Sequence, residues 1–324
     1  DFQNGAAYLY DYELDYDQWL PSVNLVWRNM DGLQFRASFF KGVAPPQFGL
    51  TRAYIPVSLE TEEDDIEAGN GRPIARPSVG NPNLLPTEAD NYDASVEWFF
   101  ADVGSLTFSL FYKEVKYVVT NYTERTDYTN NGATFEAIQN TAINASDTGD
   151  IKGFELAYQQ QYNFTDGWLG GFGLNANYTY IDSSGVPQTT LSETDPDVAA
   201  GNTTTIDTSL LPLEGLSEHT INLQPFYEYG RWSARLAYSW RSEFLLTVRD
   251  VIVPYQPIMH DDTGQLDASL FFSINDNLRI GFQGVNLTQE TIRTKAVLND
   301  DLLEAPRSWY INDRRYSISL RGNF

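Results

Sequence analysis

The sequence predicts an all-β fold, an antiparallel up-and-down transmembrane β-barrel, to which the chain contributes about eleven strands. Three observations predict it. Apolar and polar residues alternate through nearly every segment, short turns alternate with long loops, and large aromatic rings gather near both ends of the expected strands. In a strand, successive side chains point to opposite faces, so each segment has one apolar and one polar face.

The end of the chain shows the alternation clearly. Tyr316, Ile318, Leu320 and Phe324 share one parity, and Ser317, Ser319, Arg321 and Asn323 share the other. The same pattern recurs in segments of about ten residues, the length that a tilted strand needs to cross hydrocarbon. The expected strands are 21–28, 33–39, 92–100, 106–112, 154–159, 172–180, 221–229, 232–240, 266–274, 278–282 and a closing strand from Trp309.

The connections between these segments sort by length. Short turns rich in Asn, Asp and Gly are expected at 29–32, 102–104, 165–167, 230–231 and 275–277. Long loops are expected at 42–89, 121–149, 183–215, 247–263 and 289–308. Loops of this length are uncommon in compact soluble domains. Regular alternation of short and long connections is typical of bacterial outer-membrane barrels.

Composition agrees with a barrel rather than a helical membrane protein. Aromatic residues make up 14% of the chain and all hydrophobic residues only 42%, and the mean hydropathy is -0.38. A helical span would need an apolar run of about 20 residues, and the sequence has none. Rings such as Trp27 and Trp232 fall near the short turns, and Trp240 and Tyr112 near the long loops, as expected for two membrane interfaces.

Charge and chemistry exclude several functions. A net charge of -23 argues against nucleic acid as a partner, because phosphates are bound by Lys and Arg. The absence of cysteine excludes disulfides and thiolate sites. His219 and His260 are the only histidines and lie in or beside long loops, so we expect no catalytic cluster, no enzyme activity and no cofactor.

Two acidic groups have a metal-binding alternative. His260, Asp261 and Asp262 form a weak metal-site candidate, because carboxylates are hard ligands. The run from Glu60 to Asp65, with Glu67, could attract cationic or Ca²⁺-bridged partners. We favour solvated loop charges in both cases.

Four segments resemble the TonB-dependent outer-membrane transporters. Gly80-Asn-Pro-Asn-Leu-Leu-Pro-Thr-Glu-Ala-Asp-Asn-Tyr92 resembles their GNPNLKPE…NYE text at the start of a barrel strand. Similar likenesses are carried by Phe111-Tyr112-Lys113, by Gly153-Phe-Glu155 and by Gly284-Val-Asn-Leu287, and the terminal aromatic resembles the barrel-assembly signal. The resemblance implies a barrel of 22 strands, an internal plug domain and contact with the TonB complex.

Neither the plug domain nor the TonB-contacting segment is visible in the sequence. Residues 1–324 are therefore expected to be a single domain portion, the C-terminal half of such a barrel. Because open sheet edges are not tolerated in lipid, either partner strands close the barrel or the piece by itself is not native.

Two sets of residues are the candidate site. Polar side chains on the inward parity would contact the plug or line the lumen: Glu97, Lys113, Glu155, Asn175, Asn177, Gln224, Arg235, Arg315 and Arg321. Rings and arginines in the long loops would bind ligand, since rings stack on sugars and aromatic chelators and arginine grips carboxylates. These are Arg52, Tyr54, Tyr122, Tyr128, Tyr255, Trp309 and Tyr310.

The resemblance implies a receptor in the bacterial outer membrane that binds a scarce small-molecule nutrient and imports it with TonB energy. The acidic charge favours a neutral oligosaccharide over an anionic ferric siderophore, which is the next choice. Outer-membrane lipid and lipopolysaccharide are expected to surround the barrel. Two alternatives stay open, a barrel enzyme with its catalytic cluster at the rim and a secreted β-sandwich that binds glycans.

Overall fold

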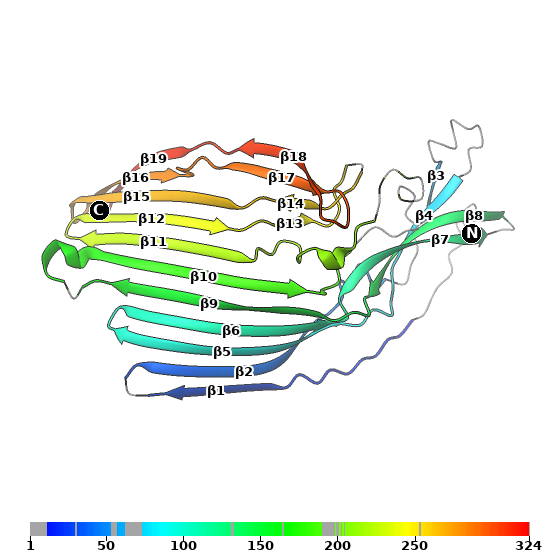
Figure 1. The fold of residues 1–324 in the computed structure, drawn as a ribbon, viewed down its shortest axis with the longest axis horizontal. Helices are drawn as coiled ribbons and strands as arrows, with labels where there is room; N and C mark the ends of the chain where they lie inside the picture. Colours follow the sequence, from blue (N-terminus) through cyan, green and yellow to red (C-terminus); the bar gives the residue numbers. More distant parts are fainter. Residues whose placement is uncertain are drawn as a thin grey trace.

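The computed structural model describes residues 12–29, 31–52, 57–61, 73–130, 133–163, 165–189, 198, 201, 203, 205–252 and 254–323. Eleven strands form one large sheet in the order β1-β2-β5-β6-β9-β10-β11-β12-β15-β16-β19, in which every pair of neighbours is antiparallel (Figure 1). The predicted all-β, up-and-down arrangement is confirmed. The bounds are β1 Ser22–Arg28, β2 Leu33–Ala44, β5 Thr87–Ala101, β6 Gly104–Lys116, β9 Gly149–Gln161, β10 Phe172–Ser184, β11 His219–Tyr229, β12 Trp232–Arg241, β15 Thr263–Asn275, β16 Leu278–Val285 and β19 Arg315–Gly322.

The pairing register gives the large sheet one apolar and one polar face. On the apolar face, Leu236 pairs with Ala268, and Leu270 pairs with both Ala234 and Phe282. This face is open: 49% of Leu110, 47% of Leu236 and 40% of Leu270 are exposed. A soluble β-sandwich would instead bury its leucines between two sheets. The apolar face therefore has the surface chemistry expected for contact with lipid tails.

Rings on the apolar face meet across strands near both ends. Phe39, Tyr92 and Tyr112 form a row at the loop end, with centroid distances of 5.0 and 6.0 Å. At the opposite end, called the turn end, Trp232 packs on Phe272 at 4.6 Å. Cross-strand ring pairs add stability beyond their buried area.

The short connections at the turn end have a local cause. The side-chain oxygen of Asn29 accepts bonds from the backbone N–H groups of Asp31 and Leu33, at 3.0 and 2.9 Å. Gly32 has a φ of +75°, and a Cβ there would lie 2.3 Å from the carbonyl oxygen of Phe99. The turn expected at 165–167 is longer than predicted, because a 3₁₀ helix, η1 (Gly167–Gly171), follows it.

Among the described residues, eight further strands lie between the strands of the large sheet, mostly in segments that the sequence analysis expected to be long loops. They form two small sheets at the loop end of the large sheet (Figure 1). The first small sheet has the order β3-β4-β8-β7 and includes a parallel β4–β8 pair. Its strands are β3 Val57–Thr61, β4 Pro73–Val79, β7 Val119–Asn130 and β8 Ala133–Asn144.

The second small sheet has the order β13-β14-β17-β18. Its strands are β13 Phe244–Thr247, β14 Ile258–His260, β17 Thr291–Val297 and β18 Glu304–Ile311. The predicted closing strand from Trp309 is therefore wrong at its start. Trp309 belongs to β18, and the last strand of the large sheet begins at Arg315.

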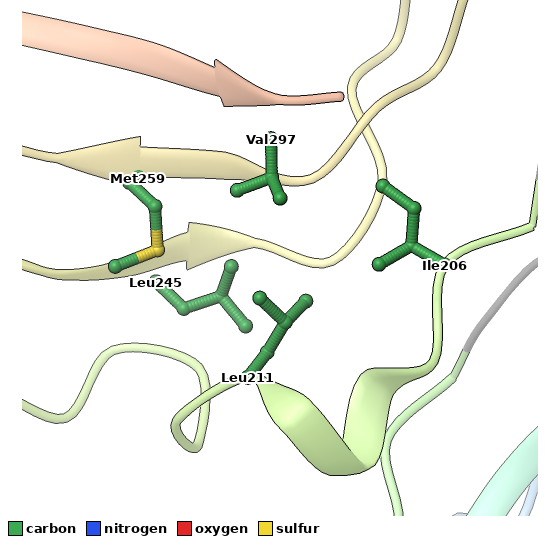
Figure 2. Packing of buried hydrophobic residues seen from close by; sticks show 5 residues of the cluster. All are labelled: Ile206, Leu211, Leu245, Met259 and Val297. Carbon is green, nitrogen blue, oxygen red and sulfur yellow. The ribbon is translucent and has the colours of Figure 1, made fainter. Parts of the chain in front are cut away.

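A small buried core lies beside the second small sheet rather than within the large one. Figure 2 shows Leu245, Met259 and Val297 of β13, β14 and the end of β17 packed against Ile206 and Leu211. The last two come from the loop between β10 and β11, around the 3₁₀ helix η2 (Thr208–Leu210). Burial of these five side chains fixes the loop to the small sheet.

Within the described residues, no pairing joins β1 to β19, so these two strands are the edges of the large sheet. The part of the chain that the structure describes also holds no helix of the length and apolarity needed to span a membrane.

Candidate functional site

The register places all nine residues predicted to face inward on the polar face of the large sheet. Several are direct neighbours across strands: Asn175 pairs with Gln224, and Glu155 with Ser109. The full set on this face is Glu97, Lys113, Glu155, Asn175, Asn177, Gln224, Arg235, Arg315 and Arg321. That this face lines a lumen and contacts a plug stays a prediction.

One part of the polar face is held by an ion-pair network. Arg36 Nε donates to Glu97 Oε1 at 2.7 Å, and Gln34 Nε2 donates to Glu97 Oε2 at 2.7 Å. Both oxygens of the Glu97 carboxylate are thus engaged by β2. The pair is partly exposed, so it fixes side-chain geometry more than it adds stability.

Next to this network the polar face is hollowed. The hollow has a volume of about 600 Å³. Charged and hydroxyl side chains line it together with apolar side chains, among them two leucines of the β10–β11 loop. Its lining includes Arg36, Asp93, Ser95, Lys113, Glu155, Leu213 and Leu216. The hollow offers hydrogen-bond donors and acceptors and charges of both signs beside apolar side chains.

The β10–β11 loop is tied to the end of β12. Arg241 donates from Nη2 to the carbonyl oxygen of Gly215 and from Nε to Ser217 Oγ, both at 2.7 Å. The Gly215 N–H donates to the carbonyl oxygen of Leu245 at 2.8 Å. These bonds and the buried core of Figure 2 hold the segment that carries Leu213 and Leu216 in place.

The predicted ligand-binding residues of the loops fall into two groups. Trp309 and Tyr310 lie on β18, and Tyr255 lies in the β13–β14 connection with Arg249 Cζ 4.7 Å from its ring centroid. Trp309 is 69% exposed. The second group, Tyr122 and Tyr128 of β7 with Arg52 of the β2–β3 connection, belongs with the first small sheet. Tyr54 lies outside the described residues.

The weak metal candidate does not come together. His260 stacks on Phe244 at 4.8 Å, Asp261 pairs with Lys295 at 2.8 Å, and Asp262 accepts from Trp240 Nε1 at 3.0 Å. Each side chain is used by a different neighbour. Among the described residues, no group of three His, Asp or Glu side chains could hold a metal ion.

Lys295 instead forms the charged centre of the second small sheet. Its Nζ lies 2.8 Å from Asp261, 2.7 Å from Glu304 and 3.4 Å from Glu243. Burial opposes its charged form, but the bonds to Asp261 and Glu304 outweigh that effect and raise its pKa above the ordinary value. Lys295 thus joins β17 to β18 and to the residue that follows β14.

A pH dependence follows from this raised pKa. A group whose folded pKa is raised contributes stability that is fully present below its unfolded pKa, about 10.4 for lysine, and lost as pH rises through the folded value. We expect proteolysis within 291–311 to be constant at neutral pH and to accelerate about fivefold in strong alkali. Lys295→Met should remove this pH dependence. Lys152→Met, which removes an exposed pair with Asp182, should leave it intact.

The comparisons with known proteins agree with this geometry. A family model described as TonB dependent receptor-like, beta-barrel, matches residues 1–287. The chain belongs to this family. TonB-dependent receptor barrels reside in the bacterial outer membrane, which places the chain there. None of the curated proteins matches the chain.

Solved structures of siderophore receptors share the fold at low identity. The siderophore receptor PirA of Acinetobacter baumannii matches with a TM-score of 0.59 and 15% identity, over 95% of this chain and 41% of that one. The ferric enterobactin receptor PfeA of Pseudomonas aeruginosa gives 0.61 and 13%, over 95% and 40%. The ferripyoverdine receptor of the same organism gives 0.55 and 14%, over 96% and 33%. The chain thus spans less than half of each receptor.

Sequence reasoning missed several residues of the TonB-dependent receptor barrel. Leu213 and Leu216 were placed in or next to a loop, although the run Leu210-Leu-Pro-Leu-Glu-Gly-Leu216 is too apolar for an exposed loop and could have indicated them. Opposed glycine and phenylalanine pairs on the polar face were also missed, because only register reveals them. These pairs are Phe111–Gly153, Phe226–Gly173 and Phe271–Gly281.

Proposed function

We propose that this chain forms the C-terminal part of the barrel of an outer-membrane receptor that binds a scarce nutrient at its loop end and imports it with energy from TonB. One observation carries the proposal: the large sheet has an open apolar face and a polar opposite face, and the small sheets at its loop end bear exposed rings. The apolar face suits lipid tails and lipopolysaccharide, and the polar face suits an enclosed interior.

The polar face is proposed to contact a plug domain. Asn175 Oδ1 is buried and has no hydrogen-bond partner in the described part of the chain. Buried polar groups are nearly always paired, so this amide calls for a further partner. The hollow beside Glu97 and Lys113 provides donors and acceptors for the same purpose. Displacement of the plug by the TonB complex would then open a path for the nutrient.

The ligand is proposed to be an oligosaccharide. Trp309 and Tyr310 of β18 and Tyr122 of β7 expose their rings at the loop end. Exposed rings stack on the flat faces of sugars without requiring charge on the ligand. The chain's net charge of -23 disfavours a strongly anionic ligand.

A ferric siderophore is the second candidate. Although the whole chain is acidic, the polar face carries positive charge that could attract an anionic ligand. Arg235 and Arg315 lie on it, and neither has an ion-pair partner among the described residues. Guanidinium groups bind carboxylates and other chelating oxygens in bidentate fashion.

A ligand screen tests this proposal. We expect calorimetry on the full-length receptor to detect binding of an oligosaccharide. Trp309→Ala should weaken oligosaccharide binding by about tenfold or more, because the exposed indole ring provides the surface on which the sugar stacks. Trp168→Ala, at the turn end, should leave affinity unchanged. If only ferric chelates bind, the ligand is the second candidate. If Trp309→Ala and Trp168→Ala bind the oligosaccharide equally well, β18 is not part of the binding surface.

A further inference from the structure

The charge of the polar face changes across the large sheet. From β12 to β19 the strands place five arginines on this face, and Asp267 is the one acidic residue among the described side chains there. In a chain of net charge -23, this sector is strongly positive. The arginines are Arg235, Arg241, Arg279, Arg315 and Arg321.

Two of these arginines are direct opposites. Arg279 of β16 pairs with Arg321 of β19 in the register. Like charges directly opposite one another in a sheet are destabilising. Within the described part of the chain, neither guanidinium has an ion-pair partner. The repulsion between them is relieved when an anion lies between or above them.

Arg279 is held over the polar face rather than left to swing away. Its Cζ lies 4.3 Å from the ring centroid of Phe271. That ring covers Gly281 of the neighbouring strand, where a Cβ would lie 2.5 Å from the ring. Glycine is therefore required for the ring to lie flat, and the ring in turn supports the guanidinium.

A polar hollow of about 350 Å³ adjoins this arginine at the turn end. Arg231 lines it too and is fixed by a bond from Nη1 to the carbonyl oxygen of Ile274, 3.1 Å long. Ser233, Ser273 and Glu228 complete the polar lining. Two arginines, Arg231 and Arg279, thus line this hollow with one carboxylate, and Arg321 lies directly opposite Arg279 in the register.

We propose that the turn end of the polar face, around Arg279 and Arg321, binds a carboxylate-bearing segment of the polypeptide that occupies the barrel interior. The inference rests on the proposed function, because it requires an interior domain. A polypeptide is favoured over a diffusing anion because the site lies at the opposite end from the exposed rings of β18 (Figure 1). Carboxylates suit paired guanidinium groups in geometry and charge.

The sign of a stability change tests the proposal in the full-length receptor. If no anion is bound, Arg279→Gln or Arg321→Gln relieves repulsion and raises the thermal midpoint. If a carboxylate segment is bound, each variant lowers the midpoint by about 2 °C at low ionic strength, and less in high salt. Arg314→Gln, which removes an exposed arginine in the break between β18 and β19, is the matched control and should change little. A raised or unchanged midpoint for both variants overturns the proposal.

Two further measurements separate loss of charge from a folding defect and identify the bound group. Arg279→Lys and Arg321→Lys retain charge and should keep most of the stability, which separates charge from a folding defect. A photo-crosslinker at position 321 should capture a peptide rich in Asp or Glu. Stabilisation of the wild type, but not of the variants, by inorganic phosphate would point to a diffusing anion and overturn the assignment. None of these outcomes bears on nutrient binding at the loop end. If the arginine proposal fails, the Trp309→Ala test of the proposed function therefore still stands.

Discussion

Replacing Leu270 with arginine is expected to prevent stable insertion of the receptor into the outer membrane. Leu270 lies near the middle of β15 on the apolar face and is 40% exposed. An arginine on the lipid side of a barrel near the bilayer midplane costs about 2–4 kcal/mol. That cost is a large fraction of the stability of most proteins. Heat-modifiable migration of membrane-extracted receptor measures the folded fraction.

The adjacent residue supplies the control. Ser269 points to the polar face, between Arg235 and Gln283. Ser269→Arg adds the same side chain on the side that we expect to hold water or polypeptide. Repulsion by Arg235, directly opposite, costs at most about 1 kcal/mol, so insertion should stay largely intact. A soluble β-sandwich predicts otherwise: an exposed leucine changed to arginine would increase solubility, and no detergent would be needed. Normal insertion of Leu270→Arg would contradict lipid contact on this face.

The large sheet could be predicted because each of its strands must alternate apolar and polar residues. A strand between lipid and a polar interior must alternate, and a slip by one residue would exchange its faces. Leu236 and Arg235 illustrate the point, since neighbours in sequence lie on opposite faces with opposite chemistry. The short turns could also be predicted, because Asn29 accepts a hydrogen bond within its turn and Gly32 adopts a positive φ.

The strands of the small sheets could not be predicted in the same way. The β7 segment VTNYTERTDYTN is polar on both parities, so it lacks an apolar face and resembles a loop. The segment from Trp309 was predicted as one closing strand because apolar residues occur both in Trp309–Ile311 and from Tyr316 onward, but a break at 312–314 separates β18 from β19. Neither the β7 strand nor this break follows from alternation.

The candidate site depends on distant pairings that one sequence does not reveal. Lys295 meets Asp261 and Glu304 only because β14 and β18 flank β17. His260, Asp261 and Asp262 are contiguous, yet each contacts a different element. Contiguity alone therefore suggested a metal site that strand pairing divides. Arg279 and Arg321 show the converse, since register makes direct opposites of residues that are far apart in sequence.

Leu245→Ala is expected to release the β10–β11 loop without unfolding the large sheet. Leu245 is completely buried, at 0% exposure, in the core that Figure 2 shows. Removing a buried leucine side chain costs about 2–5 kcal/mol. Because this core joins only the loop and the second small sheet, the cost should be local. Hydrogen exchange should accelerate in 205–218 and 244–260 and stay unchanged in β5, β6 and β9.

The next residue provides the matched control. Leu246 is 43% exposed, lies at the register shift of β13 and is not part of the buried core, so Leu246→Ala should leave exchange in 205–218 unchanged. Loss of the core should also loosen Leu213 and Leu216 at the hollow that they line, since only hydrogen bonds, such as those from Arg241 and from the Gly215 N–H, then hold the segment. Ligand affinity of the full-length receptor should fall with Leu245→Ala if the ordered loop is part of the binding surface, because the ligand must then order it. Uniformly faster exchange across the large sheet would instead show that the core and the large sheet unfold as one cooperative unit. The prediction of local release of the β10–β11 loop would then be wrong.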